Sequence, residues 1–330
     1  MDMDIVILWV DGSDPDWLEE KRKYAPPAEA DSNSVNRYRD WGLLPYWFRA
    51  IERFAPWVRK IHFVTCGHVP AFLNLEASKL YVVRHEDFIP AEYLPTFSSH
   101  TIELNLHRIE GLSEHFVYFN DDMFLNRPVK PEDFFRNGLP CDTAICDAFF
   151  PYGSQDAYVH ALCNVMAFIN ARFDKKTVMR SNPKLWFSSA YGLYVLKNLY
   201  FTPVKYLSDL KHFHVCNSML RSTFETLWET ETEILDSTCQ NKFRSISDVN
   251  QYLFTYYNIC SGQFVPRNPS FGECYTLGRN DRKLLDDIST GKHKVLCLND
   301  NPYVTDFEGL RDQLIRCYQK KFPNKSAYEM

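Results

Sequence analysis

Short apolar runs alternate along this chain with longer stretches of helical spacing. Near-continuous apolar runs occupy residues 4–10 and 116–119, as expected for strands that are covered on both faces of a sheet. Three further short runs predict strands over residues 61–65, 80–84 and 294–298. Strands separated by helical segments imply βαβ units, so the sequence predicts an α/β fold with a Rossmann-like, mostly parallel sheet.

Helical spacing predicts the segments that connect these strands. Pro15 suits the first turn of a helix, and Asp14 is expected to cap it. Apolar residues recur at helical spacing in three further segments, which are 37–54, 98–109 and 304–319. The polar, Pro-rich residues 24–36 predict a loop that could act as a flap, and the chain after Pro323 is expected to fray.

The middle of the chain, residues 155–262, is rich in helical spacing and poor in strand signals. We expect it to form a helical insertion or lid within a single catalytic domain of residues 1–330. His212 and His214 interrupt this region, but without a second pair of ligands they do not favour a zinc site.

Composition narrows the class of protein. The hydrophobic content of 45% and aromatic content of 15% are those of a globular protein, and no apolar run is long enough to span a membrane. The net charge of −5 argues against a nucleic-acid partner. The N-terminus does not resemble a secretory signal, and the ten cysteines form no CxxC pair, so we expect reduced thiols in a cytoplasmic protein.

Two adjacent carboxylates follow the strand at 116–119. Asp121 and Asp122 come directly after this strand and Asn120, and like charges about 4 Å apart repel by roughly 4 kcal/mol at an effective dielectric of 20. A divalent cation removes this repulsion, and hard oxygen ligands suit Mg²⁺ or Mn²⁺. The alternative, in which Asp121 caps the next turn and Asp122 is solvated, stays open on the local sequence alone.

Polar residues also follow two other predicted strands. Asp11 comes just after the first strand, and Asn299 and Asp300 follow the last one. Ligands of open α/β sheets bind at the carboxyl ends of the strands, so we expect the three acidic corners to meet at one edge of one sheet. This convergence favours a metal site lined by carboxylates.

The common phosphate-binding and nucleophile motifs do not occur in the sequence. There is no GxGxxG, no GxxxxGKS and no serine nucleophile elbow. A metal ion and cationic side chains would therefore have to hold any phosphate group.

Four blocks of this sequence match, in order, the conserved regions of a known family. They are DIVILWVDGSDP; the long stretch that runs from RYRDWGLLPYWFRAIERFAPWVRKIHFVT through LPTFSSHTIELNLHRIEGLSEHFVYFNDDMFLNRPVKPEDFF; HVCNSMLR with FRSISDVNQYLFTYY; and VLCLNDN. On these blocks the chain resembles the Stealth proteins, which are bacterial capsule and cell-wall polysaccharide phosphotransferases. Animal UDP-GlcNAc:lysosomal-enzyme phosphotransferase shares their core.

The resemblance implies an activity and its partners. It implies transfer of a sugar 1-phosphate from a UDP-sugar such as UDP-GlcNAc to a glycan hydroxyl. N-acetylhexosamine 1-phosphate is the favoured transferred group. UMP would be released and a phosphodiester formed, in capsule or exopolysaccharide synthesis. The expected place is the cytoplasm, with possible peripheral association at the inner face of the plasma membrane.

The resemblance also implies roles for the acidic corners. Asp122 and Asp300 look like the carboxylates that hold Mg²⁺ or Mn²⁺, with Asp121 and Asn299 beside them. Part of the nucleotide-sugar pocket is implied for the residues after the first strand and in the second block, namely Asp11, Gly12, Arg39 and Asp40.

Three residues of the third block complete the implied site. His214 matches the family histidine, which could act as a general base or donate to a phosphate oxygen. Arg221 and Arg244 match its arginines, and Arg244 suits a bidentate phosphate contact. Without the match, an interior histidine and a salt-bridged arginine would be the preferred interpretation.

Two other functions remain as alternatives. A metal-dependent glycosyltransferase would use the same residue types to make a plain glycosidic bond. A non-catalytic subunit would only bind a nucleotide sugar.

Overall fold

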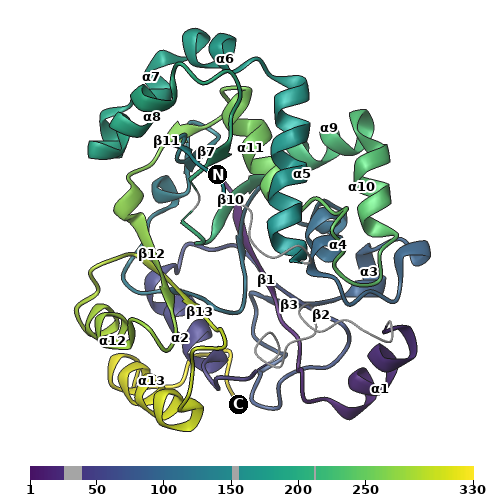
Figure 1. Ribbon diagram of the computed structural model, residues 1–330. Coiled ribbons are helices and arrows are strands. Elements are labelled where there is room, and N and C mark those ends of the chain that lie inside the picture. Colours follow the sequence, from purple (N-terminus) through teal and green to yellow (C-terminus); the bar gives the residue numbers. More distant parts are fainter. Residues whose placement is uncertain (26–38, 151–155, 212) are drawn as a thin grey trace.

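A five-stranded sheet forms the centre of the molecule (Figure 1). The computed structural model describes residues 1–25, 39–150, 156–211 and 213–330. The strand order is β10-β4-β1-β2-β3, in which β1 to β4 run parallel and β10 is antiparallel to β4. These strands are β1 (Met3–Leu8), β2 (Ile61–Thr65), β3 (Leu80–Arg84), β4 (His115–Phe119) and β10 (Asn217–Leu220). The predicted α/β fold with a mostly parallel sheet is confirmed.

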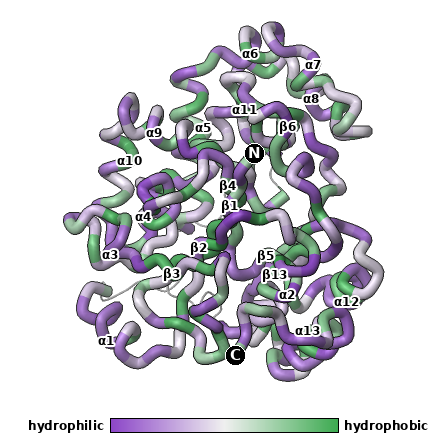
Figure 2. The backbone as a smooth tube through the Cα atoms, turned by 180° about the vertical axis from the view of Figure 1, so that it is seen from behind, coloured by the Kyte–Doolittle hydropathy of each residue, from purple (hydrophilic) through white to green (hydrophobic). Residues whose placement is uncertain are grey.

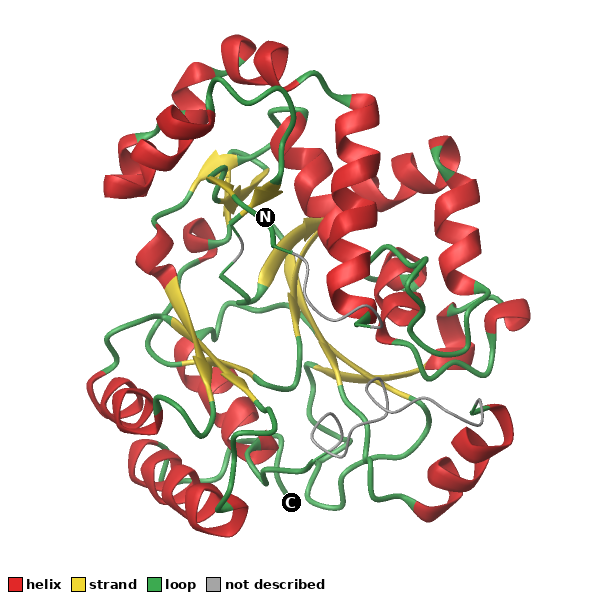
Figure 3. Ribbon diagram, viewed as in Figure 1, coloured by secondary structure: helices red, strands yellow, loops and turns green. Residues whose placement is uncertain are grey.

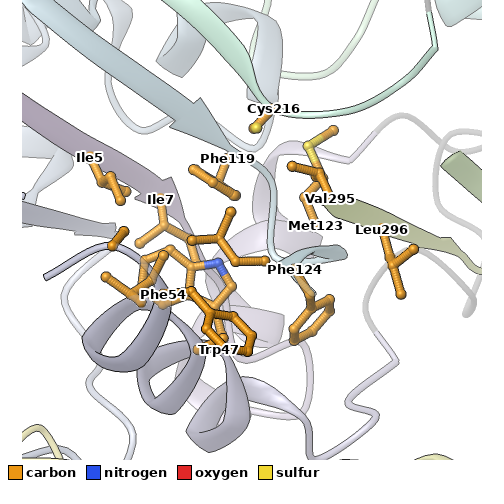
Figure 4. Close-up of a cluster of buried hydrophobic side chains, with 14 of the residues drawn as sticks. Ile5, Ile7, Trp47, Phe54, Phe119, Met123, Phe124, Cys216, Val295 and Leu296 are labelled. Atoms are coloured by element: carbon orange, nitrogen blue, oxygen red, sulfur yellow. The ribbon is translucent and has the colours of Figure 1, made fainter. Parts of the chain in front are cut away.

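Both faces of this sheet are buried, which explains the continuous apolar runs. Ile5 and Ile7 belong to one apolar cluster, whereas Val6 between them belongs to the cluster on the other face. In Figure 4 the first cluster contains Trp47 and Phe54 of the helix α2 (Leu44–Phe54). Two helices of the middle region cover the other face, namely α5 (Ala157–Arg172) and α11 (Tyr252–Cys260).

A second, three-stranded sheet corrects one prediction. Its order is β12-β13-β5, with β13 parallel to β12 and antiparallel to β5 (Figure 3). Its strands are β12 (Gly272–Thr276), β13 (Val295–Asn299) and β5 (Met123–Leu125). The expectation that all three acidic corners lie on one sheet is therefore wrong, because β13 belongs to the smaller sheet. A run of four apolar residues predicts a strand but not its partners.

The remaining strands are short. A three-stranded sheet has the order β11-β7-β6, and β8 pairs with β9. They are β6 (Phe135–Arg136), β7 (Leu139–Asp142), β8 (Cys146–Asp147), β9 (Asp209–Leu210) and β11 (Val265–Pro266).

The middle region is helix-rich, and it also supplies one strand of the main sheet. Its other helices are α6 (Lys175–Ser181), α7 (Pro183–Trp186), α8 (Val195–Phe201), α9 (Arg221–Thr230) and α10 (Thr232–Cys239). Because β10 pairs with β4, this region is joined to the sheet by hydrogen bonds as well as by packing. Whether it acts as a lid stays a prediction.

Besides α2, the described helices outside the middle region are α1 (Pro15–Tyr24), α3 (His85–Phe88), α4 (Ser99–Leu104), α12 (Asp281–Thr290) and α13 (Phe307–Lys321). Four helices outside the middle region were predicted and differ from their predicted ranges mainly in length, whereas α3 and α12 were not predicted. Asp14 caps α1 as expected, since its side chain accepts a hydrogen bond from the Trp17 N–H. The helix expected from residue 37 begins only at Leu44, where Pro45 stands in the first turn. The expected flap lies, from residue 26 onward, outside the described residues.

The C-terminal tail is docked against the body, so the expectation of fraying is wrong. The Met330 N–H donates to the Phe72 carbonyl at 2.9 Å, and Tyr328 is buried. Glu329 forms a two-point ion pair with Arg49 of α2, with N–O distances of 2.8 and 2.6 Å. Tertiary contacts to distant segments hold the tail, and a polar local sequence does not reveal them.

We expect Glu329→Gln to lower the free energy of unfolding by roughly 3 kcal/mol, because it leaves the Arg49 charge without its partner in a nearly buried place. Burial raises the pKa of Glu329, but the hydrogen bonds from Arg49 and Ser326 outweigh it and hold the pKa below its usual value. The ion pair therefore stabilises the protein above about pH 4.5 and is lost as the pH falls through the folded-state pKa.

Urea unfolding at pH 7 and pH 3 measures this contribution. The matched control is Glu308→Gln, because the Glu308–Arg311 pair on α13 is solvent-exposed, and it should cost less than about 0.5 kcal/mol. Equal effects of the two substitutions at pH 7 would contradict the docked tail.

Candidate active site

The acidic corner after β4 lies at the junction of the two sheets. β4 ends at Phe119, the chain turns through Asn120 to Asp122, and β5 then joins the smaller sheet. The Met123 N–H donates to the Asn120 carbonyl at 3.1 Å, and the Leu298 N–H of β13 donates to the Asp122 carbonyl at 2.8 Å. The turn is therefore held on one side by its own backbone and on the other by β13.

Three potential metal ligands meet at this junction. One ligand atom each of Asp122, His214 and Cys297 lies within 4.8 Å of the others, and this is the only such group of three among the residues described. The Cys297 thiol donates to Asp122 Oδ2 at 3.2 Å, and His214 Nε2 lies 3.9 Å from the same oxygen. Burial raises the pKa of the Cys297 thiol well above its usual value, so the sulfur stays protonated at neutral pH.

The other oxygen of Asp122 has no partner. Oδ1 is buried and accepts no hydrogen bond, although an unpaired buried carboxylate oxygen is costly. A hard divalent cation would satisfy this oxygen, whereas the protonated Cys297 thiol is a poor ligand for such an ion. The donor set therefore fits a cation at Asp122 and does not identify the metal.

His214 is held from its other side. Its Nδ1 lies 3.2 Å from the Tyr252 hydroxyl, and its backbone φ of +45° is unusual for a residue other than glycine. When Nδ1 carries the proton and donates it to Tyr252, Nε2 is left free on the side that faces Asp122. A histidine with one orienting partner and one free nitrogen can act as a base or as a ligand.

A pocket begins at His214 and extends away along Tyr252, Lys211 and Arg267. The Arg267 side chain is only 8% exposed, and its Nη1 has no hydrogen-bond partner. A buried guanidinium with a free donor is suited to an anionic or strongly polar ligand group.

Asp121 lies beside Asp122, with part of the residue exposed and its carboxyl surrounded by protein atoms. The dense protein around its carboxyl removes much of its hydration, and this effect together with the charge of Asp122 raises the pKa of Asp121 to about 7. The charge of Asp40 adds to the shift. The repulsion between these two neighbouring carboxylates favours the binding of a cation at this edge of the sheet.

Asp300 is held by the segment that precedes α2. Trp41 Nε1 donates to Asp300 Oδ2 at 3.1 Å, and Arg39 Nε lies 3.6 Å from the same oxygen. Burial raises the pKa of Asp300, and the Arg39 charge partly offsets this. Asp40 is exposed and accepts from the Gly42 N–H at 2.7 Å, in a turn for which Gly42 adopts φ +67°.

The segment 39–42 therefore connects two acidic corners. It contacts Asp300 through Arg39 and Trp41, and it acts on Asp121 through the charge of Asp40. Asp300 does not belong to the group of ligand atoms around Asp122. Asn299 ends β13, and its carbonyl accepts from the Leu277 N–H at 3.0 Å.

Asp11 lies after β1, the strand next to β4. Its Oδ1 accepts hydrogen bonds from the Ser13 hydroxyl and N–H at 2.7 and 2.9 Å, and the first of these is the main reason why the pKa of Asp11 is lowered. Its own N–H donates to His68 Nε2 at 2.7 Å, which ties the end of β1 to the segment that follows β2. Asp11 is thus ionised at neutral pH, at the same sheet edge as Asp121.

The two arginines of the third block lie in different places. Arg244 donates to the Ser99 hydroxyl at 2.6 Å and acts electrostatically on the Tyr118 hydroxyl, as does Asp121, so it lies on the side of the acidic corner. Arg221 follows β10 at the opposite end of β4, where it pairs with Glu225. The structure does not bring Arg221 to the corner, because β10 is antiparallel and Leu220 pairs with His115 at the start of β4.

Comparisons with known proteins decide the family. Residues 1–26 match conserved region 1 of the Stealth proteins, and residues 37–141 match conserved region 2. The capsular polysaccharide phosphotransferase WcwK of Streptococcus pneumoniae is 39% identical over 329 residues, which cover 99% of this chain and 98% of the relative. The chain belongs to the Stealth family.

Other members of the Stealth family are equally full-length matches. The exopolysaccharide phosphotransferase cps2G of Lactiplantibacillus plantarum is 40% identical, covering 99% of this chain and 96% of the relative. The receptor polysaccharide phosphotransferase WefC of Streptococcus oralis is 36% identical, covering 99% of each chain. This Stealth protein is therefore a phosphotransferase enzyme.

One solved structure is a distant match to this Stealth protein. It is the galactosyltransferase LgtC in complex with donor and acceptor sugar analogues, at 10% identity and a TM-score of 0.40 over 98% of both chains. A likeness of this size carries no argument about the site.

Several residues that contact the predicted site residues were not themselves predicted from the sequence. Cys297, Tyr252 and Trp41 each contact a predicted residue, and His68 accepts from Asp11. A usable signal existed for two of them. His68 follows the strand β2 by three residues, as the acidic residues follow their own strands, and Cys297 precedes Asn299 on the same side of a strand.

Proposed function

We propose that this enzyme transfers N-acetylhexosamine 1-phosphate from a UDP-sugar to a hydroxyl group of a glycan, with release of UMP. The product would be a phosphodiester in a capsular or other cell-surface polysaccharide. The buried, unpartnered Oδ1 of Asp122 beside His214 is the observation that supports this most, because a cation at that oxygen would receive a pyrophosphate. The relatives named above are all polysaccharide phosphotransferases.

Mg²⁺ or Mn²⁺ is the cation we propose, with Asp122 as its first ligand and His214 and Asp300 nearby. When bound, the ion would neutralise charge on the transferred phosphate. The ionised Asp11, together with Asp40 and Asp121, lines the same edge.

His214 is proposed as the general base. The acceptor oxygen forms a bond to the β-phosphorus of the donor as the bond from that phosphorus to the UMP oxygen breaks, and the hydroxyl proton passes to Nε2 of His214. Tyr252 keeps the ring in orientation through Nδ1. The acceptor would enter by the pocket of Lys211 and Arg267, and Arg244 would hold a phosphate oxygen.

We propose that the donor nucleotide binds near Asp300. We also propose that the enzyme is cytoplasmic. The described residues include no helix that is both long and apolar enough to cross a bilayer. All ten cysteines are free thiols, which supports a reducing compartment.

The test is a product analysis. The enzyme is incubated with UDP-GlcNAc, UDP-GalNAc, UDP-glucose or GDP-mannose and a panel of glycan acceptors, with and without Mg²⁺, and nucleoside monophosphate is measured by mass. We expect UMP and a phosphodiester by ³¹P NMR. Release of UDP with a plain glycosidic linkage would show a glycosyltransferase instead, and no nucleotide release from any donor would show a binding subunit.

We expect Arg39→Gln to raise the KM for the UDP-sugar by about 10-fold or more with a smaller change in kcat, because it removes a cation beside Asp300. Initial rates at varied donor concentration measure this. Arg22→Gln on the exposed side of α1 is the matched control and should leave both constants unchanged. A KM equal to that of the wild type would exclude Arg39 from donor binding.

A further inference from the structure

Exposed hydrophobic side chains gather at helix α8 and the segments that flank it. This helix lies at the end of the molecule away from the C-terminus (Figure 2). Seven of the fifteen large hydrophobic side chains that are exposed among the described residues fall between positions 193 and 206, so they are concentrated and not scattered. We call them the apolar ridge: Leu193, Tyr194, Leu196, Leu199, Tyr200, Val204 and Tyr206. Leu193 and Tyr200 are 85% and 76% exposed, values that a folded protein in water does not favour.

The helix at the centre of this ridge is apolar on two sides. Val195 and Phe201 pack against the core, and a second apolar face points away from it. Leu196, Leu199 and Tyr200 of α8 stand at i, i+3 and i+4 on one face, and this apolar face is exposed. The inner face carries Asn198, which is fully buried. Its side chain accepts from the Cys146 N–H at 2.6 Å and donates to the Ala144 carbonyl at 2.7 Å. A buried polar anchor therefore fixes α8 with this second apolar face outward.

The surroundings of the ridge are basic. Residues 175–206 contain six Lys and Arg residues and no Asp or Glu, although the whole chain has a net charge of −5. Lys176, Arg180, Lys184 and Lys205 are exposed. Lys205 Nζ also lies 4.8 Å from the ring centre of Tyr206, so a positive charge stands at the edge of the ridge itself.

We propose that the apolar ridge docks on the surface of an anionic phospholipid bilayer. Leucine side chains with tyrosines and a rim of lysines form the composition that favours the boundary between acyl chains and headgroups. Each lysine near an anionic membrane surface adds to the attraction. A two-fold contact between two copies of the ridge is less favourable, because it would bring the two basic rims together.

The ridge is connected to the candidate active site. The Tyr194 ring packs edge-on against Phe213, the residue before His214, with 5.8 Å between ring centres. Lys211, which lines the pocket at His214, lies with its Nζ 5.9 Å from the Tyr194 ring. Docking would therefore hold that pocket close to the lipid surface. The proposal itself depends only on the ridge and not on the reaction.

Vesicle flotation with the full-length protein tests the proposal without any measurement of activity. The vesicles consist of equal parts phosphatidylglycerol and phosphatidylcholine, or of phosphatidylcholine alone, at about 0.1 M and about 0.5 M salt. We expect the wild type to float with the anionic vesicles, and to float less with the neutral ones and at the higher salt concentration. The triple variant Leu196→Ser, Leu199→Ser, Tyr200→Ser should lower the bound fraction more than about tenfold.

Two further variants make the test specific. Leu75→Ser changes an equally exposed leucine outside the ridge and should bind like the wild type. Lys176→Gln with Lys184→Gln and Lys205→Gln should reduce binding to anionic vesicles to the level of neutral ones. Circular dichroism confirms that each variant is folded, as expected for changes at exposed positions.

Four results would overturn the proposal. The first is no flotation of the wild type with anionic vesicles, and the second is undiminished flotation of the apolar triple variant. The third is a wild-type dimer in analytical ultracentrifugation that the triple variant converts to a monomer without any vesicle binding, which would assign the ridge to contact between copies. Lysine substitutions without effect would exclude the anionic headgroup as the partner.

Discussion

Asp122→Asn is expected to reduce turnover by about 1,000-fold or more while leaving the protein folded. The substitution keeps the size of the side chain, but it halves the oxygen donors and removes the charge that we propose for cation binding. Loss of several kcal/mol of charge stabilisation in the transition state corresponds to a rate loss of this size. UMP release under saturating donor measures it.

Metal binding gives a second measurement for the same variant. Titration with Mn²⁺ followed by electron paramagnetic resonance should show a site in the wild type that Asp122→Asn weakens. Asp16→Asn, on the exposed side of α1, is the control for the loss of one carboxylate charge. Wild-type turnover in Asp122→Asn, or unchanged Mn²⁺ binding, would exclude Asp122 from the proposed role.

His214→Gln is expected to lower kcat by a factor of about 100 to 10,000, which is the usual contribution of a positioned general base. Glutamine keeps hydrogen-bonding ability but cannot accept the proton from the acceptor hydroxyl. Initial rates at varied donor concentration separate the two roles of this residue. A loss confined to kcat indicates a base, whereas a raised KM for the donor indicates a residue that only binds phosphate.

Tyr252→Phe distinguishes orientation from chemistry at the same histidine. It removes the hydroxyl next to Nδ1 and leaves the ring in the pocket wall. We expect a loss of about tenfold in kcat, as for a residue that only orients the base. A rate loss as large as that of His214→Gln would contradict this division of roles.

The strands were predictable from the sequence because burial on both faces leaves a local mark. The runs at 61–65 and 80–84 became β2 and β3 without any shift. β2 lies between β1 and β3 and is buried along its whole length, whereas β3 is the edge strand and was marked by its apolar and β-branched residues. The end of β4 and the start of the acidic turn were predictable for the same reason. Apolar residues stop where the strand leaves the sheet.

The partners of the strands were not predictable in the same way. β5 has only three residues, and nothing in Met123–Leu125 shows that it leaves the main sheet and pairs with β13. The sequence did not show either that β10 runs antiparallel to β4. Because β10 is antiparallel, the seven positions from His214 to Arg221 lead the chain from one end of β4 to the other, and only His214 stays near Asp122.

The junction turn at Asn120–Asp122 ties the proposed role of Asp122 to the alignment of the two sheets. The same backbone that carries Asp122 also accepts the hydrogen bond from Leu298, so a shift of the smaller sheet by one residue would carry the carboxylate away from His214. Large-to-small substitutions in the core under the smaller sheet, for example at Phe124, whose ring packs against that of Tyr318, should therefore impair turnover before they unfold the protein.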